Sequence, residues 1–154
     1  MKRILPLITL LTTLISCNIT NDDGVPPPNF DVIGLWDLTE INVNPAQDIN
    51  EDGMASTNLL DELDCISGEL LIDGDLLWSL EQTSLQVTTI TNGQFNVACS
   101  GNVVANGEWF SDENEITFED NPEFSALQIE NGTLVLNLGE DLPGFQSFMY
   151  TLRQ

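Results

Sequence analysis

The chain has 154 residues and a formal net charge of −22, with 25 Asp and Glu, three Lys and Arg, and no histidine. So few basic side chains exclude nucleic-acid binding, because phosphate contacts need Lys or Arg. Without histidine there is no Ser-His or Cys-His nucleophile pair and no His-ligated zinc, so only carboxylates remain for acid–base chemistry. No spacing singles out a carboxylate pair, and we expect a protein that is not an enzyme.

The first sixteen residues have the layout of a secretory signal peptide. Lys2 and Arg3 precede an apolar run from Ile4 to Ile15, as in the charged and hydrophobic regions of such peptides. The run is shorter than the roughly 20 apolar residues that a membrane-spanning helix needs. Residues 1–16 are therefore predicted to direct export and to be removed, which takes the formal charge from −22 to −24.

The apolar run ends in Leu14-Ile15-Ser16-Cys17, which resembles the lipobox of bacterial lipoproteins. The resemblance implies that Cys17 carries a diacylglycerol and, after cleavage, an acylated amino group. Its partner would then be the outer-membrane bilayer, held by several acyl chains because one chain binds only marginally. The alternative is an ordinary signal peptide followed by a chance cysteine.

Residues 17–31 are polar and include the proline run Pro26 to Pro28. Such a composition predicts an extended tether between the lipid anchor and a folded domain. Asp22 and Asp23 resemble the acidic export signal of some Bacteroidota surface lipoproteins, although they lie further from Cys17 than that signal does. The cell surface is therefore favoured over the periplasmic face of the membrane.

From residue 32 to the end of the chain, short alternating apolar runs are separated by turn dipeptides. An Asn-Gly pair between two such runs is the strongest short hairpin signal, because both turn residues must accept a positive φ. We expect about eight antiparallel strands joined in sequence order, an up-and-down arrangement that closes into an all-β barrel. The turn pairs are Asp73-Gly74, Asn92-Gly93 and Asn131-Gly132.

The segment STNLLDELDC, residues 56–65, breaks this rhythm. Its leucines Leu59, Leu60 and Leu63 have helical spacing. Ser56, Thr57 and Asn58 precede them as candidate N-caps. The spacing predicts a helix of about two turns between the first and second strands.

The strand GLWDLTEI contains Gly34 and Trp36 in a pattern that resembles the G-x-W motif of the lipocalin superfamily. Together with the lipobox, the strand order and the cysteine positions, it makes residues 32–154 similar to the lipocalin-like domains of small Bacteroidota lipoproteins. The resemblance implies that Arg153 packs over Trp36 in a cation–π contact. The alternative is that Trp36 is a plain core residue and Arg153 a terminal charge.

The same resemblance implies a small apolar ligand in the mouth of the barrel. The bulky aromatic residues available for a cavity can equally well fill the barrel, which would favour an envelope scaffold. A different alternative is an immunoglobulin-like sandwich that serves as an adhesion or complex-subunit module through protein contacts. The aromatic residues in question are Trp78, Trp109, Phe118 and Phe148.

The chain has three cysteines, an odd number that needs an explanation in an exported protein. If Cys17 carries lipid, Cys65 and Cys99 remain as a pair. In an oxidising compartment such a pair is expected to form a disulfide. The alternative is two buried free thiols.

The loop DINEDG contains Asp48, Asn50 and Asp52 at alternate positions before Gly53, as in the first half of an EF-hand calcium loop. The pattern predicts a Ca²⁺ site, because calcium takes six to eight oxygen ligands. The twelfth position is not the bidentate glutamate of an EF-hand, and a nearby carboxylate would have to replace it. The alternative is a solvent loop in which Asp and Gly make turns. The candidate substitutes are Asp61 and Glu62.

Overall fold

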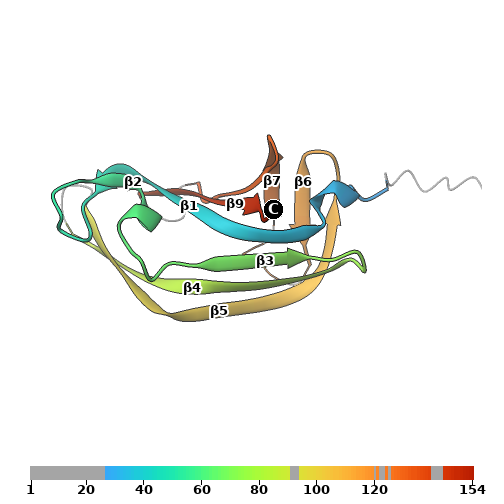
Figure 1. Ribbon diagram of the computed structural model, residues 1–154, viewed down its shortest axis with the longest axis horizontal. Helices are drawn as coiled ribbons and strands as arrows, with labels where there is room; N and C mark the ends of the chain where they lie inside the picture. Colours follow the sequence, from blue (N-terminus) through green and yellow to red (C-terminus); the bar gives the residue numbers. More distant parts are fainter. Residues whose placement is uncertain (1–26, 91–93, 120, 122–123, 125, 140–143) are drawn as a thin grey trace, which may run out of the picture.

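The computed structural model describes residues 27–90, 94–119, 121, 124, 126–139 and 144–154. Nine strands form one antiparallel sheet in this part of the chain, and β1 also pairs with β9. That pairing closes eight of the strands into a barrel (Figure 1), while β2 is a short addition along β1. The strands are β1 Gly34–Gln47, β2 Ser56–Asn58, β3 Gly68–Ile72, β4 Leu77–Thr89, β5 Phe95–Ser111, β6 Glu115–Phe118, β7 Ala126–Glu130, β8 Thr133–Asn137 and β9 Phe145–Leu152.

The closed sheet confirms the predicted up-and-down barrel. The alternative of an immunoglobulin-like sandwich is wrong, because the described strands belong to one sheet and, β2 apart, neighbours in the sheet follow one another in the chain. Among the described residues, the helices are single 3₁₀ turns, and none of them could cross a membrane.

Alternation of apolar and polar residues explains how β1 supplies the barrel interior. Trp36 and Leu38 are buried, and the register with β9 then shifts between Leu38 and Glu40. After this bulge, Ile41 and Val43 are the buried positions. An extra residue in one strand changes which positions face inward, so a strand of this length can follow the curved wall with apolar side chains inside.

The two central residues of the β7–β8 turn have the positive φ values that an Asn-Gly hairpin requires. Asn131 and Gly132 have φ values of 50° and 83°, which confirms the predicted two-residue hairpin. The β3–β4 connection is longer than Asp73-Gly74 alone, and it is held by Asp73 Oδ1, which accepts from the backbone N–H of Leu77 at 2.9 Å. The predicted turn at Asn92-Gly93 lies outside the described residues.

The predicted two-turn helix between the first two strands is wrong. Residues 56–58 form β2, and only Leu59–Asp61 form a 3₁₀ turn, η2. Asn58 does cap this turn, accepting from Leu60 N at 3.2 Å, but it also accepts from Ile41 N on β1 at 3.0 Å. Contacts with neighbouring strands therefore override the local leucine spacing.

β4 and β5 pair along almost their whole lengths, whereas β5 pairs with β6 only from Trp109 to Ser111. Residues 95–107 of β5 have no strand partner among the described residues on the edge away from β4. Figure 1 shows the two long strands running along one side of the barrel. Among the described residues, the barrel wall therefore has a gap along this edge of β5.

The first contacts with the barrel occur before residue 32. Asn29 N donates to Ser111 O at 3.1 Å, and Ser111 Oγ donates to Asn29 O at 2.9 Å. The 3₁₀ turn η1, Phe30–Val32, follows and leads into β1. The N-terminal segment is therefore attached to the end of β5 at one end of the barrel.

Candidate functional site

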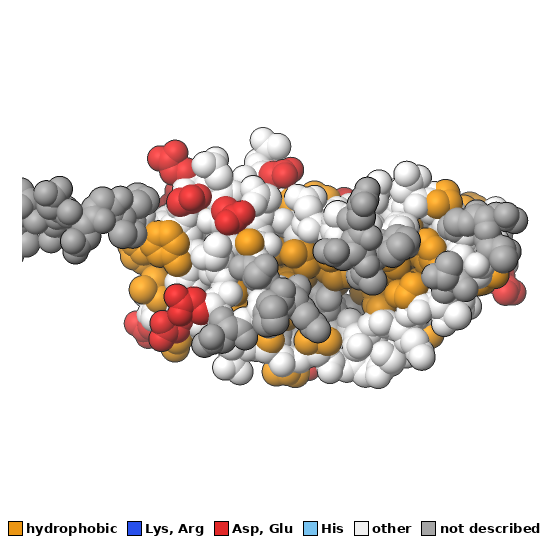
Figure 2. Space-filling model, turned by 180° about the vertical axis from the view of Figure 1, so that it is seen from behind, with side chains coloured by type: hydrophobic (Ala, Val, Ile, Leu, Met, Phe, Trp, Pro, Cys, Tyr) orange, Lys and Arg blue, Asp and Glu red, His pale blue; other side chains and the backbone are white. Residues whose placement is uncertain are grey.

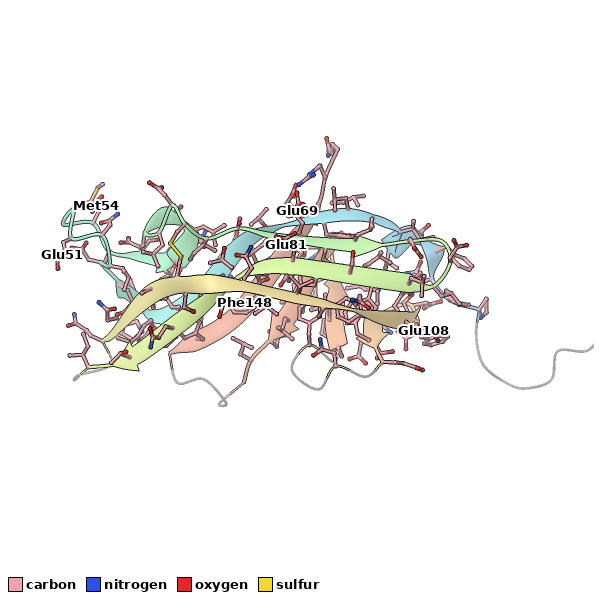
Figure 3. All side chains as sticks on the ribbon, turned by 90° about the horizontal axis from the view of Figure 1, so that it is seen from below. Glu51, Met54, Glu69, Glu81, Glu108 and Phe148 are labelled. Atoms are coloured by element: carbon pink, nitrogen blue, oxygen red, sulfur yellow. A yellow bond between two sulfur atoms is a disulfide. The ribbon has the colours of Figure 1, made fainter. Side chains whose placement is uncertain are left out.

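A cavity of about 450 Å³ lies between β4 and β5 on one side and β8 and β9 on the other. Figure 3 shows Phe148 beside the middle of β5, where it forms part of this cavity. Figure 2 shows hydrophobic side chains along the middle of one face of the molecule. The cavity is lined by the apolar residues Leu80, Leu85, Val87, Val103, Phe124, Leu136, Phe145 and Phe148 and by the polar residues Gln82, Thr83, Ser84 and Asn121.

The pairing of β4 with β5 decides which valine of β5 faces this cavity. Val103 is opposite Gln82, whose side chain reaches the buried Tyr150, so Val103 lies on the inner face. Val104 is opposite Glu81 and lies on the outer face, where it is 70% exposed. Val103 is 43% exposed and lines the cavity, and it therefore marks the rim.

Two polar side chains meet at the inner side of the cavity. Tyr150 Oη donates to Gln82 Oε1 at 2.6 Å, and Tyr150 is fully buried. Burial raises the pKa of the Tyr150 phenol, because an ionised phenolate would be removed from water. Gln82 Nε2 has no hydrogen-bond partner in the part of the chain that the structure describes, so this amide can donate to a bound molecule.

The part of the cavity wall that the structure describes has no charged side chain. Every residue from Gln82 to Gly107 is uncharged, and Glu81 and Glu108 flank this run. None of the described residues that line the cavity carries a charge. In the view of Figure 2 the red acidic side chains gather mainly toward the left-hand end, away from the apolar band.

Of the four aromatic residues proposed from the sequence, Phe148 lines the cavity and three are packed into the core. Trp78 and Phe118 lie with ring centroids 4.6 Å apart, and Trp78 stacks on Phe124 at 5.8 Å. Phe124 lines the cavity and was missed, because it follows no strand pattern. The uncharged run is the sequence signal that could have pointed to this wall.

The predicted disulfide is confirmed. Cys65 lies between η2 and β3, Cys99 lies on β5, and their sulfur atoms are bonded, as drawn in yellow in Figure 3. The backbone beside Cys65 is also attached to β4, since Thr83 Oγ1 donates to Cys65 O at 3.0 Å. The disulfide therefore fixes the segment after η2 to the two long strands. Cys17 lies outside the described residues.

Gly34 and Trp36 form the start of β1, as the G-x-W pattern suggested. A Cβ at Gly34 would lie 2.4 Å from Leu152 Cδ1, so a side chain here would require the half-exposed Leu152 side chain to move. Trp36 is buried and donates from Nε1 to Val32 O at 2.9 Å. Both residues therefore have structural roles at the closure of the barrel.

The structure does not place Arg153 over Trp36. Its guanidinium binds Asp37 and Glu69 on the outer face, with Nε 2.9 Å from Asp37 Oδ2. Trp36 and Asp37 are consecutive in β1, so their side chains point to opposite faces. The Arg153 side chain therefore lies on the outer face beside the two carboxylates. Its hydrogen bond to Asp37 lowers the pKa of the Asp37 carboxyl group.

The oxygens of the predicted calcium loop accept hydrogen bonds from the loop backbone. Asp48 Oδ2 accepts from Gly53 N at 3.1 Å, and Asn50 Oδ1 accepts from Asp52 N at 3.0 Å. Asp52 Oδ1 in turn accepts from Met54 N at 2.8 Å. The described residues contain no group of three or more His, Cys, Asp and Glu placed to hold a metal.

Of the two substitutes for the missing ligand, Glu62 is the one attached to this loop. Its buried carboxylate accepts from Ile49 N at 2.9 Å, while Asp61 accepts from Ser56 Oγ at 2.8 Å. Each carboxylate or amide oxygen has further lone pairs, so these bonds leave acceptor capacity. Calcium binding stays a prediction.

Calcium at about 100 times its Kd should stabilise the folded state by roughly 2.7 kcal/mol, if it binds only that state. For a chain of this length, each kcal/mol of added stability raises the melting temperature by about 2–4 °C. We therefore expect the melting temperature to rise by about 5–10 °C. Thermal unfolding followed by circular dichroism in millimolar CaCl₂ measures the shift. Magnesium at the same ionic strength should give less, and Asp48→Ala/Asp52→Ala should abolish it. An equal response in either control would show that the loop is only a turn.

No protein-family model, no curated protein and no solved structure matches the chain.

Proposed function

We propose that the chain is an exported lipoprotein that holds a small apolar ligand in its barrel and performs no catalysis itself. The observation that carries this proposal is the cavity of about 450 Å³ between the β4–β5 and β8–β9 walls. Its volume falls in the range of about 300–1,000 Å³ that is typical of small-molecule sites. Its lining is mostly aliphatic and aromatic, with a few polar groups that could orient a ligand.

The proposed anchor rests on the sequence features around Cys17 and fits the position of the N-terminal segment. That segment joins the barrel at Asn29, on the end of β5, so the tether would leave from one end of the domain. Acyl chains on Cys17 would hold this end toward the outer membrane. The acidic pair Asp22 and Asp23 supports placement at the cell surface.

Binding of Nile red, a neutral dye that fluoresces in apolar sites, tests the ligand cavity. We expect a saturable rise in fluorescence with the full chain, because the cavity removes the dye from water. Val103→Trp should weaken binding at least tenfold by filling the rim, whereas Val104→Trp, the same change on the outer face, should not. If Nile red does not bind, or both variants bind as the parent does, the ligand proposal is wrong and an envelope scaffold is favoured.

Cys17→Ala should abolish incorporation of labelled fatty acid and leave the protein either unprocessed or released from the membrane fraction. The physical reason is that the thiol would be the only attachment point for the diacylglycerol. Metabolic labelling with an alkyne fatty acid, followed by fractionation, measures both effects. Ser16→Ala keeps a small residue before the cleavage site and serves as the matched control. Undiminished labelling of Cys17→Ala would rule out the lipid anchor.

A further inference from the structure

The positions of charged side chains relative to the cavity restrict the kind of ligand that the cavity can accept. None of the described lining residues is charged, and the uncharged run from Gln82 to Gly107 supplies much of the wall. A carboxylate or phosphate group inside would therefore need a cation from elsewhere in the domain. Burying a charged group without a partner is costly, so the location of the basic side chains decides this question.

Arg153 is the only basic residue after Arg3. Its guanidinium is bound to Asp37 and Glu69 on the outer face of the barrel. Neither carboxylate lines the cavity, and Arg153 does not line it either. An anionic ligand group would thus meet no counter-ion among the described lining residues, and it would also experience the field of a strongly acidic domain.

A cationic group fares no better at close range. Glu81 and Glu108, the acids that flank the uncharged run, are absent from the described lining. The polar groups that do line the cavity are neutral, and Gln82 offers an amide that can donate a hydrogen bond.

We propose that the cavity selects an uncharged amphiphile, with a hydrocarbon or aromatic body and a hydroxyl or amide group, and rejects fatty acids. This inference rests on the proposed ligand-binding function and gives the chemical class of the ligand. The apolar wall, with Leu80, Leu136 and Phe148, receives the body. The polar side of the cavity, with Gln82, receives the hydroxyl or amide group.

Displacement of Nile red by three ligands tests the proposal. The ligands share a ten-carbon chain and differ in the polar group and its charge. The full chain is used with Cys17→Ser, so that no acyl group attached there competes for the cavity. In detergent-free buffer at physiological salt, decanol should displace the dye at a concentration at least tenfold lower than decanoate. Decylammonium should be no more effective than decanol. The proposed selectivity would be overturned if decanoate displaced the dye at the same concentration as decanol or a lower one, or if decylammonium displaced it at a lower one.

A charge placed at the rim provides an independent check. Val103→Lys should improve displacement by decanoate about tenfold, because Val103 is partly exposed and its replacement can keep the ammonium at the water interface. Val104→Lys adds the same charge on the outer face and should leave the decanoate value unchanged. Equal effects of the two variants would show that the overall charge, and not the cavity, controls discrimination.

The outcomes separate this inference from the proposed function. If Nile red binds and is displaced by decanoate as readily as by decanol, a ligand cavity exists but it does not select against charge. If Nile red does not bind in the parent chain, the ligand-binding function itself is wrong. Two results together support both the ligand-binding function and the selectivity. Decanol displaces the dye at lower concentration than decanoate in the parent protein, and displacement by decanoate improves in Val103→Lys but not in Val104→Lys.

Discussion

Reduction of the Cys65–Cys99 disulfide should lower the free energy of unfolding by about 3–4 kcal/mol. The two cysteines are separated by 34 positions, and the crosslink restricts a loop of that length in the unfolded chain. For this chain length the loss corresponds to a fall of roughly 10 °C in melting temperature. Urea unfolding of the oxidised and the reduced protein, followed by tryptophan fluorescence, measures the difference.

The disulfide also fixes the position of the segment after η2 in the folded protein. The segment after η2 is attached to β4 through Thr83, which binds the backbone of Cys65 and Ser67. Cys65→Ala/Cys99→Ala should therefore reproduce the loss seen on reduction. Cys17→Ser removes the third cysteine and should leave stability unchanged. Two titratable thiols in the unreduced Cys17→Ser protein would contradict the assignment.

The strands were predictable because their information is local. Alternation gives the buried face of each strand, and Asn131-Gly132 gives a turn whose positive φ values the structure contains. Consecutive hairpins leave little choice of topology, and the barrel closes because β1 pairs with β9 at the far end of the chain. This pairing joins the two strands that are furthest apart in the sequence, and the resemblance to lipocalin-like domains implied the closed barrel that contains it.

The errors arose where distant residues compete with local pattern. Leucine spacing after Asn58 indicated a helix, but Asn58 itself bonds to β1 and the disulfide holds the chain after η2 against β5. Arg153 could be assigned to the last strand from sequence, yet not to a partner. Its contact with Glu69 depends on the lateral pairing of β1 with β3, which no local pattern reveals.

The cavity was unpredictable for the same reason. Val103 and Phe148 face the same cavity although they are far apart in sequence and lie on strands that do not pair. Whether aromatic side chains fill a barrel depends on how their volumes combine across it, and composition does not contain this information. The uncharged run from Gln82 to Gly107 was visible, but its meaning follows only when Gln82 and Val103 are known to face inward.

Raising the pH above about 10 should destabilise the domain by about 1.4 kcal/mol for each further pH unit. Burial raises the pKa of Tyr150 above the value of the phenol in the unfolded chain, so the folded state keeps its proton at pH values where the unfolded state releases it. The stabilisation is therefore complete below the unfolded pKa and is lost as the pH rises toward the folded pKa. Unfolding by urea at a series of alkaline pH values measures the slope.

Because the chain has one tyrosine, the ionisation of Tyr150 can be followed directly. Tyr150 is the single tyrosine, and no lysine follows Lys2. Near-ultraviolet tyrosinate absorbance thus reports Tyr150 alone, and we expect it to appear together with unfolding and not before. Tyr150→Phe keeps the ring and loses the hydrogen bond to Gln82, which should cost about 1 kcal/mol at neutral pH. Its stability should then be nearly independent of pH where that of the parent falls. Ionisation near pH 10 in the still folded protein would show that water reaches the phenol, and with it the inner side of the cavity.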